Sequence, residues 1–250
     1  MVKYVYGTRQ RIFINTALGC NADCKYCYMP KLGYKKKKEM ISGELAVQLV
    51  KNMACFVSGE KGTILSIGCY SECLDEENLN ETKKILKEVL PLGNPVQLAT
   101  KQIIREEVCD LIKKYRNYNE QMNVYISMPT ISKISQIEPG TLSAKGRIEN
   151  IKKCIKYSIP VVLYIKPFLE KITGNDLENY VEIVKKYKIP VVVGPYLYIE
   201  KKEIIADVGE GELYEVNDFD KRRQFLSELK KYTSVYEHST ECIFNPGKTK

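Results

Sequence analysis

Short apolar runs alternate with longer amphipathic segments along most of the chain, and this alternation constrains the fold more than any other feature. The runs are rich in Val, Ile and Tyr and are too short to be buried helices. Such alternation is typical of parallel strands joined by helices that cover the sheet. We expect strands at Ile12–Leu18, Thr63–Gly68, Val96–Thr100, Asn123–Met128, Val161–Lys166 and Val191–Gly194.

The longer segments repeat their apolar residues at helical spacing. The first places Leu45, Leu49 and Met53 on one predicted core face, and the fourth places Ile151 and Ile155 on another. Together with the strands they predict an α/β fold, a partial (β/α)6 TIM-type barrel with parallel strands. The expected helices are Gly43–Val57, Glu76–Leu90, Ile103–Tyr115, Ala144–Tyr157 and Asp176–Tyr187.

The pattern weakens after residue 196, so we expect a core barrel at about 10–196 and a C-terminal extension at 197–250. The extension holds a predicted helix at Asp220–Tyr232, and we expect its tail to close the open side of the barrel. No composition shift or linker divides the 250 residues, which predicts a single domain spanning 1–250.

Composition narrows the class of protein. The chain has no apolar stretch long enough for a membrane helix and no signal-peptide pattern, so we expect a cytoplasmic protein without membrane contact. Its nine cysteines are then reduced and serve as core, catalytic or metal-binding residues. The net charge of +8 favours weak attraction to polyanions, although no nucleic-acid-binding signature accompanies it.

A compact cysteine motif follows the first predicted strand. Residues 19–30 read GCNADCKYCYMP, which spaces Cys20, Cys24 and Cys27 as C-x3-C-x2-C. Three thiolates so close in sequence can hold a cubic 4Fe–4S cluster and leave one iron without a protein ligand. Zinc would need a fourth ligand and more often uses two C-x2-C pairs, and unrelated core cysteines are the remaining alternative.

This motif, with Tyr26 before its last cysteine, resembles the signature of the radical S-adenosylmethionine (SAM) superfamily. The resemblance implies that SAM binds the open iron. Reductive cleavage then yields a 5′-deoxyadenosyl radical, which abstracts hydrogen from a substrate. It also implies an electron donor such as flavodoxin or ferredoxin. The hypothesis for this chain is therefore an enzyme whose cluster loop lies at the mouth of the barrel.

Three further segments resemble the branch that contains spore photoproduct lyase: SIGCYSECL at 66–74, LATK at 98–101 and E-x-G-T-x-S-x-x-x-R at 138–147. The resemblance implies that Cys69 donates hydrogen to a product radical, although a buried cysteine is often only a small apolar residue. For Arg147, a contact with the SAM carboxylate and a supporting ion pair both remain open. The implied SAM contacts are Tyr26, Ser71, Lys101, Ser127 and Arg147.

The match has departures that leave the substrate open. The glycine-rich GGE stretch of many radical SAM enzymes is replaced by residues 69–72. Since the cluster loop begins near residue 20, we expect the region that precedes this loop in spore photoproduct lyase to be missing. We expect a nucleic acid lesion or nucleotide as substrate, with the basic run Lys35–Lys38 near its approach. A peptide maturase and a non-catalytic iron–sulfur protein are the alternatives.

The other cysteines have simpler interpretations. Cys55, Cys109 and Cys154 fall in predicted helices and are expected in the core, and Cys73 has little claim to a role. His238 and Cys242 form only a weak candidate ligand pair in the tail.

Overall fold

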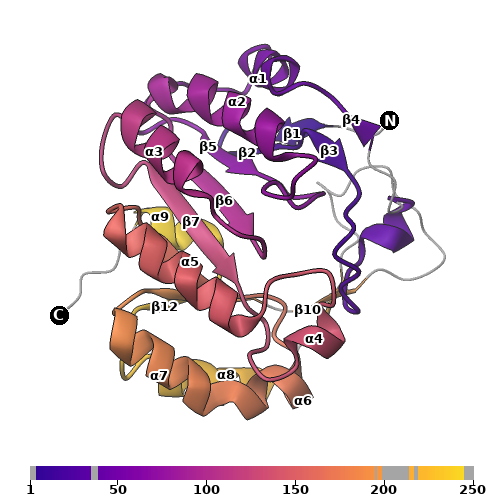
Figure 1. Cartoon of the computed structure of the whole chain (residues 1–250), viewed down its shortest axis with the longest axis vertical. Coiled ribbons are helices and arrows are strands. Elements are labelled where there is room, and N and C mark those ends of the chain that lie inside the picture. The colour runs from indigo at the N-terminus through magenta and orange to yellow at the C-terminus, as the bar shows by residue number, and fades with distance from the viewer. Residues whose placement is uncertain (1–3, 35–38, 195, 199–213, 217–218, 245–250) are drawn as a thin grey trace.

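The computed structural model describes residues 4–34, 39–194, 196–198, 214–216 and 219–244. Its centre is an eight-stranded sheet in the order β1-β2-β5-β6-β7-β8-β9-β12 (Figure 1). Strand β1 is antiparallel to β2, and every other neighbouring pair is parallel. The strands are β1 Val5–Gly7, β2 Arg11–Ile14, β5 Ile64–Ile67, β6 Val96–Thr100, β7 Met122–Ser127, β8 Val161–Ile165, β9 Val191–Val193 and β12 Val235–Tyr236.

Figure 1 shows most of the helices around the outside of this sheet. Side chains alternate along each strand: Leu163 and Ile165 join the large core beneath the helices, whereas Val162 and Tyr164 belong to a second cluster on the inner face. The helices are α1 Gly43–Lys51, α2 Leu79–Val89, α3 Glu106–Tyr115, α4 Ile134–Ile137, α5 Ala144–Lys156, α6 Glu170–Thr173, α7 Leu177–Tyr187, α8 Phe219–Leu229 and α9 Ser239–Phe244.

The six predicted parallel strands are confirmed as β2, β5, β6, β7, β8 and β9. The first prediction was too long, because the chain leaves the sheet after β2 and forms a separate antiparallel pair, β3 Ala17–Leu18 with β4 Glu39–Met40. Asn15 marks the break: its backbone N–H donates to the Tyr4 carbonyl at 2.8 Å. A second small hairpin joins β10 Tyr196–Tyr198 and β11 Tyr214–Val216.

Helix α1 differs from its prediction in both length and core face. It ends at Lys51, and Leu45 and Leu49 are 44% and 39% exposed. The buried face is instead small, formed by Gly43, Ala46, Val47 and Val50. A Cβ atom at Gly43 would come within 2.4 Å of the Glu81 carbonyl oxygen, so α1 packs too close to α2 for large side chains at this point. Ile155 of α5 is likewise 45% exposed, against expectation.

The described part of the C-terminal extension completes the sheet and covers its inner face. Strand β12 adds beside β9, and α9 lies behind β6 and β7 in Figure 1. The Ser239 carbonyl accepts hydrogen bonds from Gln97 Nε2 at 2.9 Å and Tyr125 Oη at 2.8 Å. Cys242 packs on Tyr125 in the inner cluster, whereas His238 is exposed, so the two residues have different surroundings.

Within the described residues, no helix combines the length and apolar character needed to cross a bilayer. The predicted basic run Lys35–Lys38 and most of the charged stretch after Tyr198 lie outside the described residues.

Candidate functional site

The cysteine loop follows β3 at the carboxyl ends of the parallel strands. Gly19 and Asp23 adopt positive φ values of 99° and 51°, which turn the chain back on itself. Three backbone hydrogen bonds anchor the loop on both sides: Gly19 N–H to the Tyr70 carbonyl at 3.1 Å, Lys25 N–H to Ile137 at 2.9 Å, and Gly140 N–H to Ala22 at 3.0 Å. The loop is therefore held between the end of β5 and the segment before α5.

The three cysteine side chains of this loop are half-buried, and all are free thiols. Burial raises the pKa of Cys24 to about 11, with smaller contributions from nearby Glu138, Cys27 and Cys20 that are partly offset by Lys101. Burial also raises the pKa of Cys20. These mutual effects place the three thiols in one small region, and an iron–sulfur cluster would counter the raised pKa values by binding the thiolate form.

As the side chains stand, no three Cys, His, Asp or Glu residues of the described ranges are gathered tightly enough to hold a metal ion. The three thiols therefore lie near one another without converging on a single point. Three half-exposed sulfurs on one turned loop fit the three protein-ligated corners of a cubic cluster, provided that their side chains rotate toward one another.

A buried ion pair supports the loop from below. Glu138 and Arg147 are both 0% exposed, with Arg147 Nη1 2.7 Å from Glu138 Oε2. Tyr26 donates its hydroxyl hydrogen to Glu138 Oε1. The remaining Arg147 donors go to the Leu142 and Ser127 carbonyls at 3.1 and 2.7 Å and to Thr141 Oγ1 at 2.5 Å. Of the two roles expected for Arg147, this geometry favours the supporting ion pair.

Lys101 lies just after β6, between two buried carboxylates. Its Nζ is 3.9 Å from Glu138 Oε1 and 5.8 Å from the centre of the Tyr26 ring. Burial alone would lower the pKa of Lys101, but the charges of Glu138, Cys24 and Glu72 outweigh it and raise that pKa. The side chain is 23% exposed, so part of it reaches the surface of the site.

Glu72 is a site residue that the sequence reasoning did not select. Its carboxylate accepts hydrogen bonds from Thr100 Oγ1 at 2.6 Å and from the backbone N–H groups of Lys101 and Leu74 at 2.9 and 3.2 Å. Burial raises its pKa, and these donors partly offset that rise. Glu72 and Cys20 together line an open cavity of about 150 Å³. The only signal in the sequence was its place in the stretch that replaces GGE.

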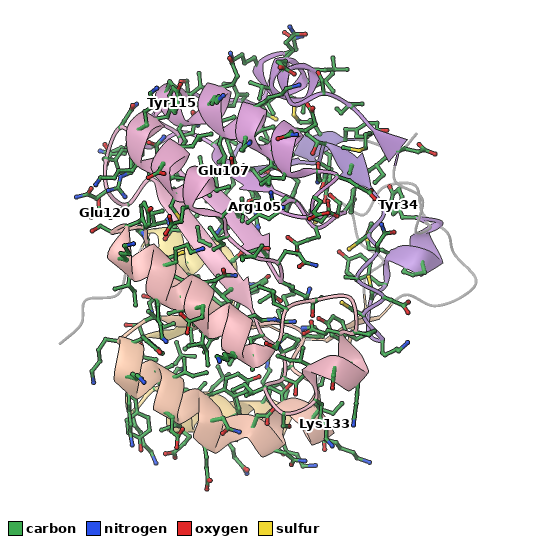
Figure 2. The ribbon with its side chains drawn as sticks, viewed as in Figure 1. Tyr34, Arg105, Glu107, Tyr115, Glu120 and Lys133 are labelled. Atoms are coloured by element: carbon green, nitrogen blue, oxygen red, sulfur yellow. The ribbon has the colours of Figure 1, made fainter. Side chains whose placement is uncertain are left out.

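Cys69 lies two residues after the end of β5, among aromatic side chains. The Tyr6 hydroxyl donates to Cys69 Sγ at 3.3 Å. Burial raises the pKa of Tyr28 well above its usual value. The nearby groups raise it further, so Tyr28 lies close to Cys69, Tyr70, Cys27 and Tyr164. Tyr6 also stacks on Tyr70, which stacks on Tyr34 at 5.2 Å. Figure 2 shows Tyr34 on the side of the molecule that carries the cysteine loop, far from Tyr115 on the outer helix layer.

The two predicted serines are more enclosed. Ser71 is 9% exposed, and its Oγ accepts from Asn78 Nδ2 at 3.2 Å. Ser127 ends β7 and is 4% exposed, with its carbonyl bound to Arg147. The structure thus brings Tyr26, Lys101, Ser127 and Arg147 into one network beside the cysteine loop. Cys69 lies in a separate, aromatic part of the same mouth.

Comparisons with known proteins agree with this geometry. The model of the family described as radical SAM superfamily matches residues 14–184. Spore photoproduct lyase complexed with dinucleoside spore photoproduct has the same fold, with a TM-score of 0.61 and 17% identity, over 88% of this chain and 74% of that one. SuiB of Streptococcus suis gives a TM-score of 0.62 at 12% identity, over 95% of this chain and 51% of SuiB.

Among curated proteins, the ribosomal protein uS12 methylthiotransferase RimO of Clostridium botulinum (strain Eklund 17B / Type B) is 23% identical over 242 residues. The chain spans about half the length of this relative, since the match covers 90% of the chain and 51% of RimO. The family match covers well over half of the chain and includes the cysteine loop. The protein therefore belongs to the radical SAM superfamily, whose members are enzymes.

Proposed function

We propose that this protein cleaves SAM at a 4Fe–4S cluster held by Cys20, Cys24 and Cys27, and uses the resulting radical on a nucleotide or nucleic acid substrate. The cluster and SAM, when bound, supply a 5′-deoxyadenosyl radical that abstracts a hydrogen atom. The observation that carries the proposal is the turned loop of three half-buried thiols at the carboxyl ends of parallel strands.

The chain's own residues provide the binding site for SAM. The half-buried Lys101 ammonium suits the SAM carboxylate, and Glu138 and Glu72 fix its position and keep it charged. Tyr26 packs under this ammonium while it donates to Glu138. Ser71 and Ser127 are both buried, and they are proposed to form the wall of the site behind SAM.

Cys69 is the proposed hydrogen donor to the product radical. A thiol S–H bond is weak, and the Tyr6 hydroxyl holds the sulfur from the side of β1. Cys69 is half-buried, and the surrounding tyrosine rings shield its thiol from part of the solvent, which limits loss of a radical to water. The proposed electron donor is a flavodoxin or ferredoxin, and a cytoplasmic location stays a prediction.

The test begins with anaerobic reconstitution, analysis of iron and sulfide, and incubation with SAM and dithionite. We expect about four irons per chain and formation of 5′-deoxyadenosine. Cys24→Ala should lose both, whereas Cys55→Ala, which removes an equally half-buried thiol outside the loop, should keep both. A reconstituted protein that binds iron and sulfide but never cleaves SAM would refute the catalytic proposal.

Cys69→Ala separates the thiol from the cluster. We expect this variant to keep its iron and its substrate-free cleavage of SAM, because Cys69 lies in the aromatic part of the mouth. With the dinucleoside spore photoproduct as a trial substrate, the wild type should incorporate deuterium from heavy water through the exchangeable thiol. The variant should not.

A protein or peptide substrate is the second candidate. It is favoured by the similarity to RimO, which is named for its action on a ribosomal protein. Methylthiolation or another modification of an added ribosomal protein uS12, with no reaction on nucleotides, would support it instead.

A further inference from the structure

A second lysine, Lys166, lies at the mouth of the barrel directly after the end of β8. The alternation along β8 places Val162 and Tyr164 on the inner face and Leu163 and Ile165 toward the helices. Lys166 is the next residue, so it continues the inner-face series at the carboxyl end of the strand. This is the same edge of the sheet that carries Cys69 and Lys101.

A missing side chain on the neighbouring strand makes room for this lysine. Gly194 follows β9 in register with Lys166, since Ile165 pairs with Val193. A Cβ atom at Gly194 would lie 2.6 Å from Lys166 Cδ and 3.0 Å from its Cγ. The Lys166 stem therefore lies directly across Gly194, on the inner side of the sheet.

The backbone fixes both residues. Gly194 N–H donates to the Ile165 carbonyl at 3.1 Å, and Phe168 N–H donates to the Gly194 carbonyl at 2.9 Å. These bonds hold the two strand ends together on either side of Lys166. The Lys166 stem therefore extends from a fixed backbone position and passes beside Gly194.

The two inward lysines differ in their partners. Lys101 has Glu138 at 3.9 Å and Glu72 nearby, so protein carboxylates already face it. Lys166 is half-buried, and its Nζ makes no ion pair or hydrogen bond with any residue that the structure describes. A partly desolvated cation that has no counter-ion among the described residues is a binding position for an anion brought by a ligand.

The surroundings favour a phosphate attached to a base. Tyr164 is on the same inner face two residues earlier, and Tyr28 lies near both Tyr164 and Cys69. Flat aromatic rings beside a cation suit a nucleobase and its phosphate better than an acidic peptide. Resting on the proposed function, we infer that Lys166 binds a phosphate of the nucleotide substrate and so sets how the substrate lies relative to Cys69.

The test measures the affinity of the reconstituted, SAM-loaded protein for thymidylyl-thymidine (TpT) by titration calorimetry. Its uncharged methylphosphonate counterpart is measured in parallel. We expect the wild type to bind TpT about tenfold or more tightly than the counterpart, because a hydrogen bond to a charged group is lost in the latter. Lys166→Met should lower the affinity for TpT by a similar factor and leave that for the counterpart unchanged.

Two variants sharpen this result. Gly194→Ala keeps the charge but displaces the Lys166 stem, so it should also weaken TpT binding. Lys113→Met removes the same charge from the exposed surface of α3 and should leave TpT binding unchanged. Iron content and substrate-free SAM cleavage should be equal in all of these proteins, which shows that each is folded.

Several outcomes would overturn the inference: equal TpT affinity in wild type and Lys166→Met, no preference for the charged probe, or tighter binding of a glutamate-rich peptide. Failure of the wild type to cleave SAM is a different result. It would refute the proposed chemistry, while the calorimetric comparison would still decide the role of Lys166.

Discussion

Glu138 and Asp176 are both almost completely buried, yet the protein satisfies the two carboxylates in different ways. Glu138 faces the cations Arg147 and Lys101, and its Oε2 accepts no aligned hydrogen bond from the described residues. Asp176, which precedes α7, accepts only from neutral donors: Thr130 Oγ1 at 2.8 Å, Ile131 N–H at 2.7 Å and Ser132 N–H at 3.2 Å.

The difference follows the position of each group. Asp176 fixes the loop after β7, a task for which short hydrogen bonds are enough. Glu138 lies beside the thiols and the proposed SAM position, where paired charges fix Lys101 as well as the backbone. In this protein, buried full charges of both signs are found where a charged cofactor is expected, and neutral donors are used where only a loop must be held.

The largest effect should come from removing the cation of the first region. Arg147→Met leaves Glu138 buried without its main counter-ion, so we expect the free energy of unfolding to fall by about 3–5 kcal/mol. Chemical denaturation measures this change. Adding Glu138→Gln to the same protein should restore part of the lost stability. If Arg147→Met alone were as stable as the wild type, Glu138 would not depend on a buried counter-ion.

Asp176→Asn should cost less, about 1–3 kcal/mol, because one neutral amide replaces a hydrogen-bonded carboxylate. Burial alone would raise the pKa of Asp176, but the hydrogen bonds from Ile131, Ser132 and Thr130 outweigh it and lower that pKa. The stability from this carboxylate is therefore present above its unfolded pKa of about 3.9 and is lost as the pH falls through the lowered folded value.

That sign can be checked with the same pair of proteins. Unfolding of the wild type and Asp176→Asn should be followed by denaturation from pH 7 downward. We expect the stability difference between them to be constant near neutrality and to shrink on acidification. A difference that grows as the pH falls would mean that the pKa of Asp176 is raised instead.

A smaller change is expected for Thr130→Val. It removes one donor to Asp176 but leaves both backbone donors in place, so we expect a loss of about 1 kcal/mol in the free energy of unfolding. In the Asp176→Asn background the same substitution should cost less. Equal costs in both backgrounds would show that the hydroxyl acts elsewhere.

The smallest expected effect is a change in hydrogen exchange, which compares the region around Glu138 with the region around Asp176 in the unmutated protein. Cluster assembly should slow hydrogen exchange a few-fold at the amides of Lys25 and Gly140, because these bonds anchor the cysteine loop. The amides of Ile131 and Ser132, which bind Asp176, should not change. An equal slowing of exchange at all four amides would contradict the idea that the region around Glu138 responds to the cofactor and the region around Asp176 does not.

The sequence pattern predicted the parts of the fold that depend on local periodicity. The six parallel strands and the placement of the cysteine loop follow from alternation and from motif spacing. The predicted core face of α1 was wrong. Large apolar residues indicate the buried face of a helix only where neighbouring helices pack at the usual distance. Where Gly43 brings α1 against α2, small side chains are buried and Leu45 is exposed.

The site was predictable only where a motif marked it. The motif spacing identified Cys20, Cys24 and Cys27, and the family resemblance identified Lys101. Tyr6 and Gly194 reach the mouth through strand pairing, which no local sequence pattern reveals. Lys166 was visible only as the last residue of a predicted strand. Its inward direction depends on the register of β8 with β9.

The hydrogen bond from Gln97 to the Ser239 carbonyl joins residues that are 142 positions apart. A ribosome must therefore synthesise the chain as far as Ser239 before the amide of Gln97 and the hydroxyl of Tyr125 meet this acceptor. Until then both polar groups face an incomplete interior, where water must satisfy them. Removing α9 should thus impair solubility during expression more than the loss of a six-residue helix suggests.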